Sequence, residues 1–466
     1  MIVMKFGGSS VGALARVQTV ARIIVHETEE KVVVLSAMSG VTDALLKAGS
    51  AAAAGTNYQT TYDEIIAKYR SLLEGLGAEE RPRADARLTT LAEDLQEVLD
   101  AIAAFRFCIT RMRDLLVSFG ERMICALMPY FLRSLGAASH EVDARTLIVT
   151  DDHFGNARVL FGETEAKLAA WKKGLQDVPV ITGFIAATSD GMTTTLDRGG
   201  SDYTATIIGS GIGAERVEIW TDVNGAMTAD PRMIPAARVI DSLTYEEAAE
   251  MAYFGAKVLH PLTLLPVAKK KIPVVIKNTF EPHAPGTRIS STSPIVKGVV
   301  KTIATRTGLT LINLEGGAFS GHAGSAGKVF TALGRAGVNI IMISQGSSEQ
   351  SICLVIQHTQ NNTAISSLTK EFAREIEDGL MRIIMEENVC VVSVIGDGMK
   401  GTPGISGHVF GALGNTQINI LAIAQGSSER SISAVITEAD RAMALEVLHK
   451  EFIKIPLVPA AKKVWM

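Results

Sequence analysis

The sequence predicts an α/β protein in which a mainly parallel sheet lies between helices and is followed by two small α+β units. Two observations predict this fold. Short apolar runs alternate with stretches of helical periodicity over the first 280 residues, which is the pattern of βαβ units and parallel sheets. A 26-residue stretch beginning at Gly327 recurs at Gly407, 80 residues later, which indicates two copies of one supersecondary unit.

Length and composition indicate a globular protein of several domains. The 466 residues are 47% hydrophobic and 20% charged, whereas one domain usually takes about 150 residues. The net charge of −4 provides no field that would attract nucleic acid or an anionic membrane. The four cysteines lack metal-binding spacing, so we expect neither a disulfide nor a metal site. The N-terminus lacks a signal-peptide pattern, and we expect a cytoplasmic protein.

The first elements form a βαβ unit. Residues 2–6 and 31–36 are apolar runs typical of buried strands, and helical spacing follows each of them, from Leu14 and from Thr42. Residues 57–133 are mostly helical, and an apolar stripe from Leu88 to Ile102 predicts a helical lobe beside the sheet.

Alternation then resumes and ends at a boundary. Strand-like runs occupy 178–187, 217–222 and 273–278, and helical stretches occupy 202–210 and 244–258. Residues 281–298 contain three prolines among Ser, Thr and Gly, which marks a linker. We therefore expect a catalytic domain at 1–280 and repeat units at 299–380 and 381–466. Each unit should contain a helix, a strand carrying Asn339 or Asn419, a Gln-Gly-Ser-Ser-Glu turn and a second strand.

The loop after the first strand is the first candidate for anion binding. Lys5 precedes Gly7, Gly8 and Ser9, between a strand and a helix N-terminus. Unhindered backbone N–H groups and the helix dipole favour phosphate there, and Lys5 can add a point charge. A tight turn with a surface lysine remains the alternative. The loop lacks the spacing of a Walker A motif.

The run Thr193–Asp202 is the densest polar stretch of the chain. Ser201 or Asp202 could act simply as an N-cap of the following helix. A functional interpretation also explains the preceding residues, with Arg198 as a bidentate carboxylate clamp, Gly199 and Gly200 as backbone donors, and Asp202 as the partner of a catalytic lysine.

A third motif follows the strand at 217–222. Thr221 and Asp222 stand at the end of a predicted strand, where open α/β sheets bind ligands, and Arg232 could contact phosphate. The alternative is that this segment forms ordinary turns, since its Asn-Gly and Asp-Pro pairs are typical of turns. Lys257 lies near a predicted helix end, where a lysine often only compensates the dipole.

These motifs favour phosphoryl transfer. They provide glycine-rich anion sites with lysines and arginines, but no nucleophile paired with an oriented base. In phosphoryl transfer the enzyme mainly positions groups and neutralises charge. A carboxylate acceptor, with a pKa of ~4, needs no general base at neutral pH.

Taken together, the motifs KFGGSSV, SAMSGVTDAL, SFGER, TLDRGGSD, WTDVNGAMTADPR and FGAKVLHP, in this order, resemble those of aspartate kinases. The resemblance covers residues 1 to about 280 and implies the amino-acid kinase fold. The repeated C-terminal part resembles the pair of ACT regulatory domains of the same family, which are ferredoxin-like.

The resemblance also implies roles for individual residues. Lys5 and Lys257 would neutralise the transferring phosphoryl group, and Asp202 would organise them. The aspartate-binding residues would be Thr42, Glu121, Arg198 and Ser201. The ATP-binding residues would be Lys5, Gly7, Gly8, Ser9, Thr221, Asp222, Met227, Asp230, Arg232 and Lys257, although many members of the family have tyrosine at position 227. Mg²⁺ should accompany ATP, with no protein ligand evident.

Regulation by an end-product amino acid is also implied. The effector residues would be Asn339, Gln345, Asn419 and Gln425, and the paired turns favour threonine over lysine. Satisfaction of backbone groups is the alternative role for these side chains. We expect at least a homodimer, and a monofunctional kinase, because no residues follow the second repeat that could form a fused homoserine dehydrogenase. The alternative functions are another amino-acid kinase, such as glutamate 5-kinase, and a non-catalytic ACT sensor.

Overall fold

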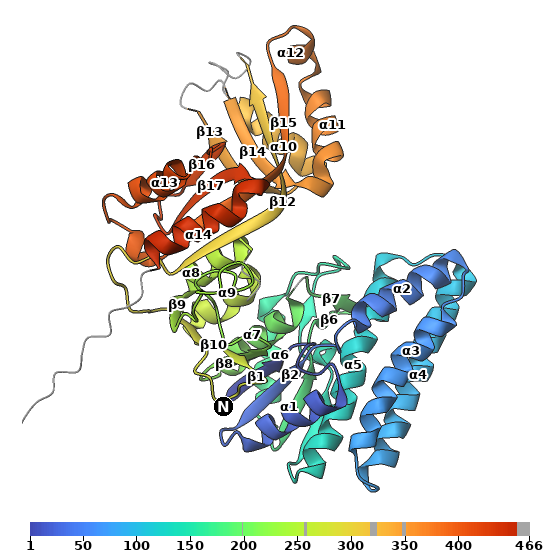
Figure 1. Cartoon of the computed structure of the whole chain (residues 1–466). Helices are drawn as coiled ribbons and strands as arrows, with labels where there is room; N and C mark the ends of the chain where they lie inside the picture. Colours follow the sequence, from blue (N-terminus) through green and yellow to red (C-terminus); the bar gives the residue numbers. More distant parts are fainter. Residues whose placement is uncertain (198, 256–258, 317–323, 347–350, 454–466) are drawn as a thin grey trace, which may run out of the picture. The chain divides into compact units, whose positions relative to one another are not determined.

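The structure is a computed structural model and describes all residues except 198, 256–258, 317–323, 347–350 and 454–466. The chain divides into two compact units (Figure 1). The N-terminal unit comprises Met1–Ala226, Val239–Ala249 and Val258–Ser293. The C-terminal unit comprises Met227–Arg238, Glu250–Lys257 and Pro294–Met466. Two segments that precede the repeats in the sequence, and interrupt the N-terminal unit, therefore belong to the same unit as the repeats.

The N-terminal unit is built on an eight-stranded sheet. In spatial order its strands are β3 (Ser139–Val142), β5 (Val178–Thr182), β2 (Lys31–Leu35), β1 (Ile2–Phe6), β8 (Val217–Thr221), β10 (Val274–Asn278), β11 (Thr287–Ser290) and β9 (Ser242–Thr244). The first six strands are parallel, and β11 pairs with β10 in the antiparallel sense. The predicted mainly parallel sheet is confirmed.

Helices surround this sheet. They are α1 (Leu14–His26), α2 (Val41–Ala54), α3 (Gln59–Arg70), α4 (Glu80–Phe105), α5 (Thr110–Ser134), α6 (Phe161–Lys172), α7 (Gly200–Ile212), α8 (Tyr245–Tyr253) and α9 (Pro261–Lys270). The predicted lobe consists of α3, α4 and α5 beside α2 (Figure 1). The apolar stripe on α4 is fully buried from Leu88 to Ile102 and joins one core with β1, β2 and α5. Helical spacing of leucines thus predicted the buried face correctly.

One predicted strand divides in two. Residues 178–187 form β5 in the main sheet and β6 (Ile185–Thr188) in a small second sheet, β4-β6-β7. The other strands of this small sheet are β4 (Val149–Thr150) and β7 (Thr193–Thr195). Between β5 and β6 the backbone of Phe184 is left-handed, with φ of 66°. Continuous hydrophobicity could not reveal this break, because both halves are buried.

The C-terminal unit contains a six-stranded antiparallel sheet. Its spatial order is β13 (Ile340–Gln345), β14 (Ser351–Gln357), β12 (Thr302–Glu315), β15 (Arg382–Ile395), β17 (Ser431–Thr437) and β16 (Ala422–Gln425). The described helices that accompany the sheet are α10 (Ser325–Arg335), α11 (Asn361–Glu371), α12 (Ala373–Glu377), α13 (Ile405–Asn415) and α14 (Arg441–Phe452).

The repeat is longer than the sequence reveals. The helices α10 and α13 and the strands β14 and β17 are displaced by the predicted 80 residues, and so are β12 and β15. The sequences of β12 and β15 have little in common, so comparison of residues alone missed this pair. Each copy has its own apolar core. The two predicted α+β units are confirmed, but Asn339 and Asn419, which were predicted to lie within strands, precede β13 and β16.

In the part of the chain that the structure describes, one helix, α5, is long and apolar enough to cross a membrane by length and composition. Its most apolar stretch is 83% buried within the protein, as expected of a core helix. This burial matters for the site described below, because α5 carries a glutamate into a cavity.

Candidate functional site

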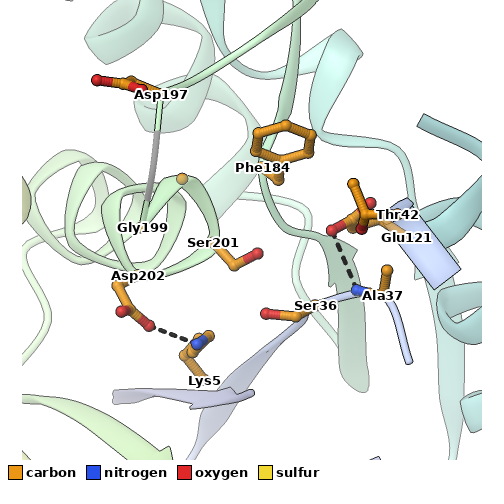
Figure 2. A pocket seen from close by; sticks show the side chains of 11 residues that line it. Lys5, Ser36, Ala37, Thr42, Glu121, Phe184, Asp197, Gly199, Ser201 and Asp202 are labelled. Carbon is orange, nitrogen blue, oxygen red and sulfur yellow. Dashed lines mark hydrogen bonds and ion pairs between the residues drawn. The ribbon is translucent and has the colours of Figure 1, made fainter. Parts of the chain in front are cut away.

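A cavity of about 220 Å³ opens at the carboxyl ends of β1 and β2 in the N-terminal unit (Figure 2). Ligands of open α/β sheets usually bind at this edge. Seven of its eleven lining residues were proposed from the sequence to bind substrate or act in catalysis, and the other four were not assigned a role from the sequence. The lining residues are Lys5, Ser36, Ala37, Thr42, Glu121, Phe184, Asp197, Gly199, Gly200, Ser201 and Asp202.

Lys5 and Asp202 form an ion pair on one side of the cavity (Figure 2). The Nζ and Oδ1 atoms are 2.5 Å apart, and both side chains are largely buried. Lys5 is the fourth residue of β1, and Asp202 lies in the first turn of α7. A Cβ placed at Gly7 would be 3.5 Å from Lys5 Nζ, so the glycine loop passes close to the ammonium group. The glycine-loop motif and the polar run are far apart in the sequence, and the fold brings Lys5 and Asp202 together.

Glu121 enters the cavity from α5. Its Oε1 accepts a hydrogen bond of 3.0 Å from the backbone N–H of Ala37, and its Oε2 is buried with no hydrogen-bond partner among the described residues. Burial raises the pKa of Glu121 to about 8, although the Ala37 hydrogen bond and Lys5 oppose this shift. A buried carboxylate with a free oxygen suits a cationic ligand group, since an ammonium would supply the missing partner.

The N-terminus of α7 forms another side of the cavity. Gly199 is left-handed, with φ of 76°, which favours glycine. Gly200 allows the helix to approach Phe184, because a Cβ there would lie 2.6 Å from the phenylalanine ring. The backbone N–H of Phe184 donates in turn to Thr204 Oγ1 at 3.0 Å. Ser201 and the first N–H groups of α7 therefore face the cavity as anion donors.

The glycine loop and the end of β8 lie side by side. Strands β1 and β8 are parallel neighbours, with Phe6 opposite Trp220, so Gly7 and Thr221 follow at the same edge. A Cβ at Gly8 would lie 2.7 Å from the carbonyl oxygen of Ala37. Close packing therefore requires glycine at position 8.

Thr279, which follows β10, is hydrogen-bonded both to the glycine loop and to the end of β8. Thr279 Oγ1 is 2.7 Å from Ser10 Oγ, and the Thr279 N–H donates to the Thr221 carbonyl oxygen at 2.8 Å. On the other side of the loop, Arg16 donates to the carbonyl oxygen of Ser9 at 2.8 Å. Thr221 and Asp222 are hydrogen-bonded to each other by their side chains. The residues proposed for phosphate and nucleotide binding in this unit are thus held in one ordered edge.

Three proposed nucleotide residues belong to the C-terminal unit. Met227, Asp230 and Arg232 lie in the segment Met227–Arg238. Asp230 Oδ2 pairs with Arg232 at 2.6 Å, and the hydrogen bond from Arg232 lowers the pKa of Asp230. Neighbouring Ala229 and Ile234 are buried in the core of the second repeat.

Two predicted site residues, Arg198 and Lys257, lie outside the described residues. The four proposed effector residues are described and exposed, near the ends of the edge strands β13 and β16. Gln425 Oε1 accepts a hydrogen bond of 3.2 Å from Ser406, and the Asn339 N–H donates to Gln360.

Sequence reasoning did not assign a role to Ser36, Ala37, Phe184 or Asp197. Ser36 and Ala37 come directly after β2, a position that already marks ligand sites in parallel sheets. Asp197 is inside the polar run that was recognised. Phe184 gave no signal, because a left-handed phenylalanine cannot be inferred from an apolar run.

The parallel sheet and the cavity define a ligand-binding α/β domain that presents both an ion-paired lysine and an unpaired buried carboxylate. Family models agree with this description. Residues 1–278 match the Amino acid kinase family, and residues 312–372 and 392–452 each match an ACT domain. The chain belongs to the aspartokinases of the amino acid kinase family.

Individual relatives support this assignment. The chain is 36% identical over 463 residues to bifunctional aspartokinase/homoserine dehydrogenase 2 of Zea mays, covering 97% of this chain and 50% of that protein. It is 33% identical over 468 residues to aspartokinase 1 of Arabidopsis thaliana, covering 97% and 80%. The chain spans about half the length of the bifunctional relatives.

A solved structure shows the same fold over the whole chain. The structure of E. coli aspartokinase III in complex with aspartate and ADP matches with a TM-score of 0.83 and 31% identity, covering 97% of this chain and 100% of that one. The complex of the same enzyme with lysine and aspartate matches with a TM-score of 0.79, 31% identity and the same coverage. The predicted amino-acid kinase fold followed by ACT domains is confirmed.

Proposed function

We propose that this protein is an aspartate kinase, which converts ATP and L-aspartate to ADP and 4-phospho-L-aspartate. The observation that carries the proposal is that one cavity contains both a buried cationic group and a buried acidic group with a free oxygen. The cationic group is Lys5, which is ion-paired with Asp202, and the free oxygen is Oε2 of Glu121. Aspartate has one ammonium and two carboxylates, and this cavity offers a partner for each kind of group.

The substrate is oriented by its charges. Its ammonium pairs with Glu121, whose ionised form the bound cation stabilises. The N-terminus of α7 with Ser201, together with Thr42, supplies donors for carboxylate oxygens. Arg198, which immediately precedes Gly199 in the chain, is proposed as the clamp for the α-carboxylate by resemblance.

The transfer itself requires positioning and charge neutralisation. A side-chain carboxylate oxygen attacks the γ-phosphorus, the bond to the β–γ bridging oxygen breaks, and ADP leaves with the electron pair. Lys5 offsets negative charge on the phosphoryl oxygens, and its ion pair with Asp202 fixes the ammonium in place. Lys257 is proposed for the same role by resemblance. No proton has to be removed, because the acceptor is already ionised at ~pH 7.

The glycine loop and the end of β8 are proposed to receive the nucleotide. Gly7, Gly8 and Ser9 offer backbone N–H groups to phosphate, and Thr221 and Asp222 lie at the same edge of the sheet. Met227, Asp230 and Arg232 complete the proposed set. Mg²⁺ would accompany ATP. When bound, it would help to neutralise the charge of the phosphates. Among the described residues, no three His, Cys, Asp or Glu side chains are grouped so that they could hold a metal ion.

An assay of ADP release with each amino acid tests the activity. Aspartate should support release, and hydroxylamine should trap the acyl phosphate as the hydroxamate. Turnover with glutamate instead would identify the alternative amino-acid kinase, such as glutamate 5-kinase. If no amino acid supports release while an amino acid still raises the melting temperature, the protein is a non-catalytic ACT sensor.

The paired ACT domains support feedback inhibition by an end product of the aspartate pathway to lysine, threonine and methionine. The two Gln-Gly-Ser-Ser-Glu sequences, of which residues 347–349 lie outside the described residues, favour threonine, and the lysine complex of E. coli aspartokinase III supports lysine as the alternative. The effector residues are Asn339, Gln345, Asn419 and Gln425. ACT pairing also supports a cytoplasmic homodimer or a larger homo-oligomer, which light scattering of the full chain would measure.

The effector can be identified by comparing ligands. Thermal shifts with threonine, lysine and methionine should rank their affinities, since binding to the folded state raises the melting temperature. The same three amino acids should then inhibit ADP release in the same order. An order that differs between the two measurements would contradict assignment of one regulatory site.

A further inference from the structure

A second buried carboxylate lies on the helix that carries Glu121. Asp114 precedes Glu121 by seven residues on α5, which is about two helical turns, so the two side chains share one face. Asp114 is 1% exposed. Burial of a carboxylate is costly unless hydrogen bonds compensate for the lost water, so the partners of Asp114 indicate what it holds.

Among the described residues, the hydrogen-bond partners of Asp114 are Gly155, in the loop that follows β4, and Thr195, at the end of β7. Its Oδ2 accepts hydrogen bonds from the backbone N–H groups of Gly155 at 2.8 Å and Thr195 at 3.0 Å. Its Oδ1 accepts from Thr195 Oγ1 at 2.9 Å. Burial raises the pKa of Asp114, whereas these hydrogen bonds and the nearby Arg113 act in the opposite direction.

Thr195 leads directly into the candidate site. It is the last residue of β7, and the cavity residues Asp197, Gly199, Gly200, Ser201 and Asp202 follow within seven positions. The strand end is fixed further by Leu196, whose N–H donates to the Phe184 carbonyl oxygen at 2.9 Å. Asp114 thus connects the helix that carries Glu121 with the strand that leads to the N-terminus of α7.

The proposed substrate extends between these two elements. Glu121 receives its ammonium, and the N-terminus of α7 receives carboxylate oxygens, so the separation of the two elements must match the length of the ligand. We propose that Asp114 is a positioning and specificity-determining residue, which sets this separation to suit aspartate rather than its longer homologue glutamate. This inference rests on the proposed function.

The proposal predicts a selective effect of Asp114→Asn. The substitution preserves shape but replaces one acceptor oxygen with an NH₂ donor, which opposes the donors of Gly155 and Thr195. The KM for aspartate should rise on the order of tenfold or more, because small misplacements of binding groups are costly. The KM for ATP should change less, and the preference for aspartate over glutamate should fall.

Variants of Thr195 test the same link with less risk to folding. Thr195→Val removes the hydroxyl and keeps the backbone hydrogen bond, so it should raise the KM for aspartate by about threefold to tenfold. Thr195→Ser should restore values near those of the parent. Combined with Asp114→Asn, Thr195→Val should add little, since both break one interaction.

Asp151 provides a matched control, because it lies in the same loop as Gly155, after β4. Asp151 accepts hydrogen bonds from the N–H of Arg158 at 2.8 Å and from the N–H of His153, but among the described residues no hydrogen bond joins it to Thr195. Asp151→Asn should leave the KM for aspartate unchanged.

The outcomes separate the two proposals. If the parent protein shows no aspartate-dependent ADP release, the proposed function fails and this inference fails with it. If the parent is active but Asp114→Asn and Thr195→Val retain its KM for aspartate and its discrimination against glutamate, only the inference is overturned. A uniform loss of active protein, with unchanged KM values in the remainder, would show that Asp114 is merely structural and would also overturn it.

Discussion

The proposed active-site and effector residues of this protein differ in their exposure to water. In the N-terminal unit, Lys5 and Glu121 are buried, 7% and 3% exposed, and their partners hold them in defined positions. In the C-terminal unit, Gln345 and Gln425 are exposed on the edge strands of the sheet. Buried charges interact strongly because water does not screen them, whereas exposed amides can form or lose contacts at small cost. Substitutions of the buried charged residues in the proposed active site should therefore impair catalysis or substrate binding, and substitutions of the effector glutamines should change only the control of turnover.

The largest effect is expected from Lys5→Ala. Loss of the ammonium leaves the phosphoryl charge and Asp202 without a partner, so kcat should fall on the order of a hundredfold to a thousandfold. The measurement is ADP release at saturating aspartate. Lys47→Ala, at an exposed position of α2, serves as the control and should retain the activity of the parent. Substantial turnover in Lys5→Ala would remove the contrast between the two units.

Glu121→Gln should weaken substrate binding while stabilising the protein. Loss of the charged contact should raise the KM for aspartate by about 10- to 100-fold. The pKa of Glu121 is raised to about 8 in the folded protein, against about 4.5 when unfolded, so the folded state binds the extra proton between these values. Stability of the parent therefore declines as pH rises from about 4.5 to 8.

The neutral glutamine lacks this decline. Above pH 8 the variant should be more stable than the parent, on the order of a few kcal/mol, and near pH 4 the difference should vanish. Urea unfolding across this pH range provides the measurement. Glu97→Gln on the exposed face of α4 should follow the parent at every pH. Equal pH dependence in the parent and Glu121→Gln would contradict a buried, protonated Glu121.

Gln345→Ala and Gln425→Ala should relieve inhibition without changing uninhibited turnover. Because a typical coupling free energy is 1–3 kcal/mol, we expect the effector concentration for half inhibition to rise by about tenfold. Gln357→Ala, on the exposed end of β14, controls for loss of any surface glutamine. Unchanged inhibition in both variants would refute assignment of these two glutamines to the effector site.

The smallest effect is expected from a substitution in the second repeat that removes its hydrogen bond to the segment Met227–Arg238. His449 on α14 is buried, and its Nε2 is 3.0 Å from Thr228 Oγ1. Burial, aided by Arg238, lowers the pKa of His449 from its usual 6.5. The unfolded state therefore binds more protons as pH falls through about 6.5, and stability falls with it.

His449→Gln should remove this pH dependence and cost about 1 kcal/mol near neutral pH. Thermal unfolding between pH 5 and 8 would reveal both effects. The exposed His408 of the same repeat, which pairs with Glu451, provides the control through His408→Gln. If acid destabilises the parent and His449→Gln equally, the histidine does not anchor this segment.

Local patterns predicted much of the fold because each depends on neighbouring residues. The leucine stripe from Leu88 to Ile102, the strand Ile2–Phe6 and the 80-residue repeat all appear in the structure. The short strands β4, β7, β9 and β11 were missed, since each has only two to four residues. Such strands exist because a neighbouring strand pairs with them, which no single window of sequence records.

Many residues of the candidate site could also be found in the sequence. Strand ends followed by glycine and polar residues drew attention to Gly7, Gly199 and Asp202, and the order of the motifs indicated the family. The role of Asp114 gave no comparable signal. Its partners Gly155 and Thr195 are 41 and 81 residues away, and a single aspartate in a helix is unremarkable until these donors are known.

The sequence by itself determined which chemical groups this protein has and how its secondary structure is patterned. The tertiary structure decided which of these groups are buried, which are ion-paired and how strongly they hold a proton. It paired Lys5 with Asp202, buried Glu121 so that its pKa rises, and packed the segment Met227–Arg238 with the C-terminal repeats. The physical reason is that periodicity follows from bonds between neighbours, whereas burial, ion pairing and proton affinity depend on residues that the fold brings together from distant parts of the chain.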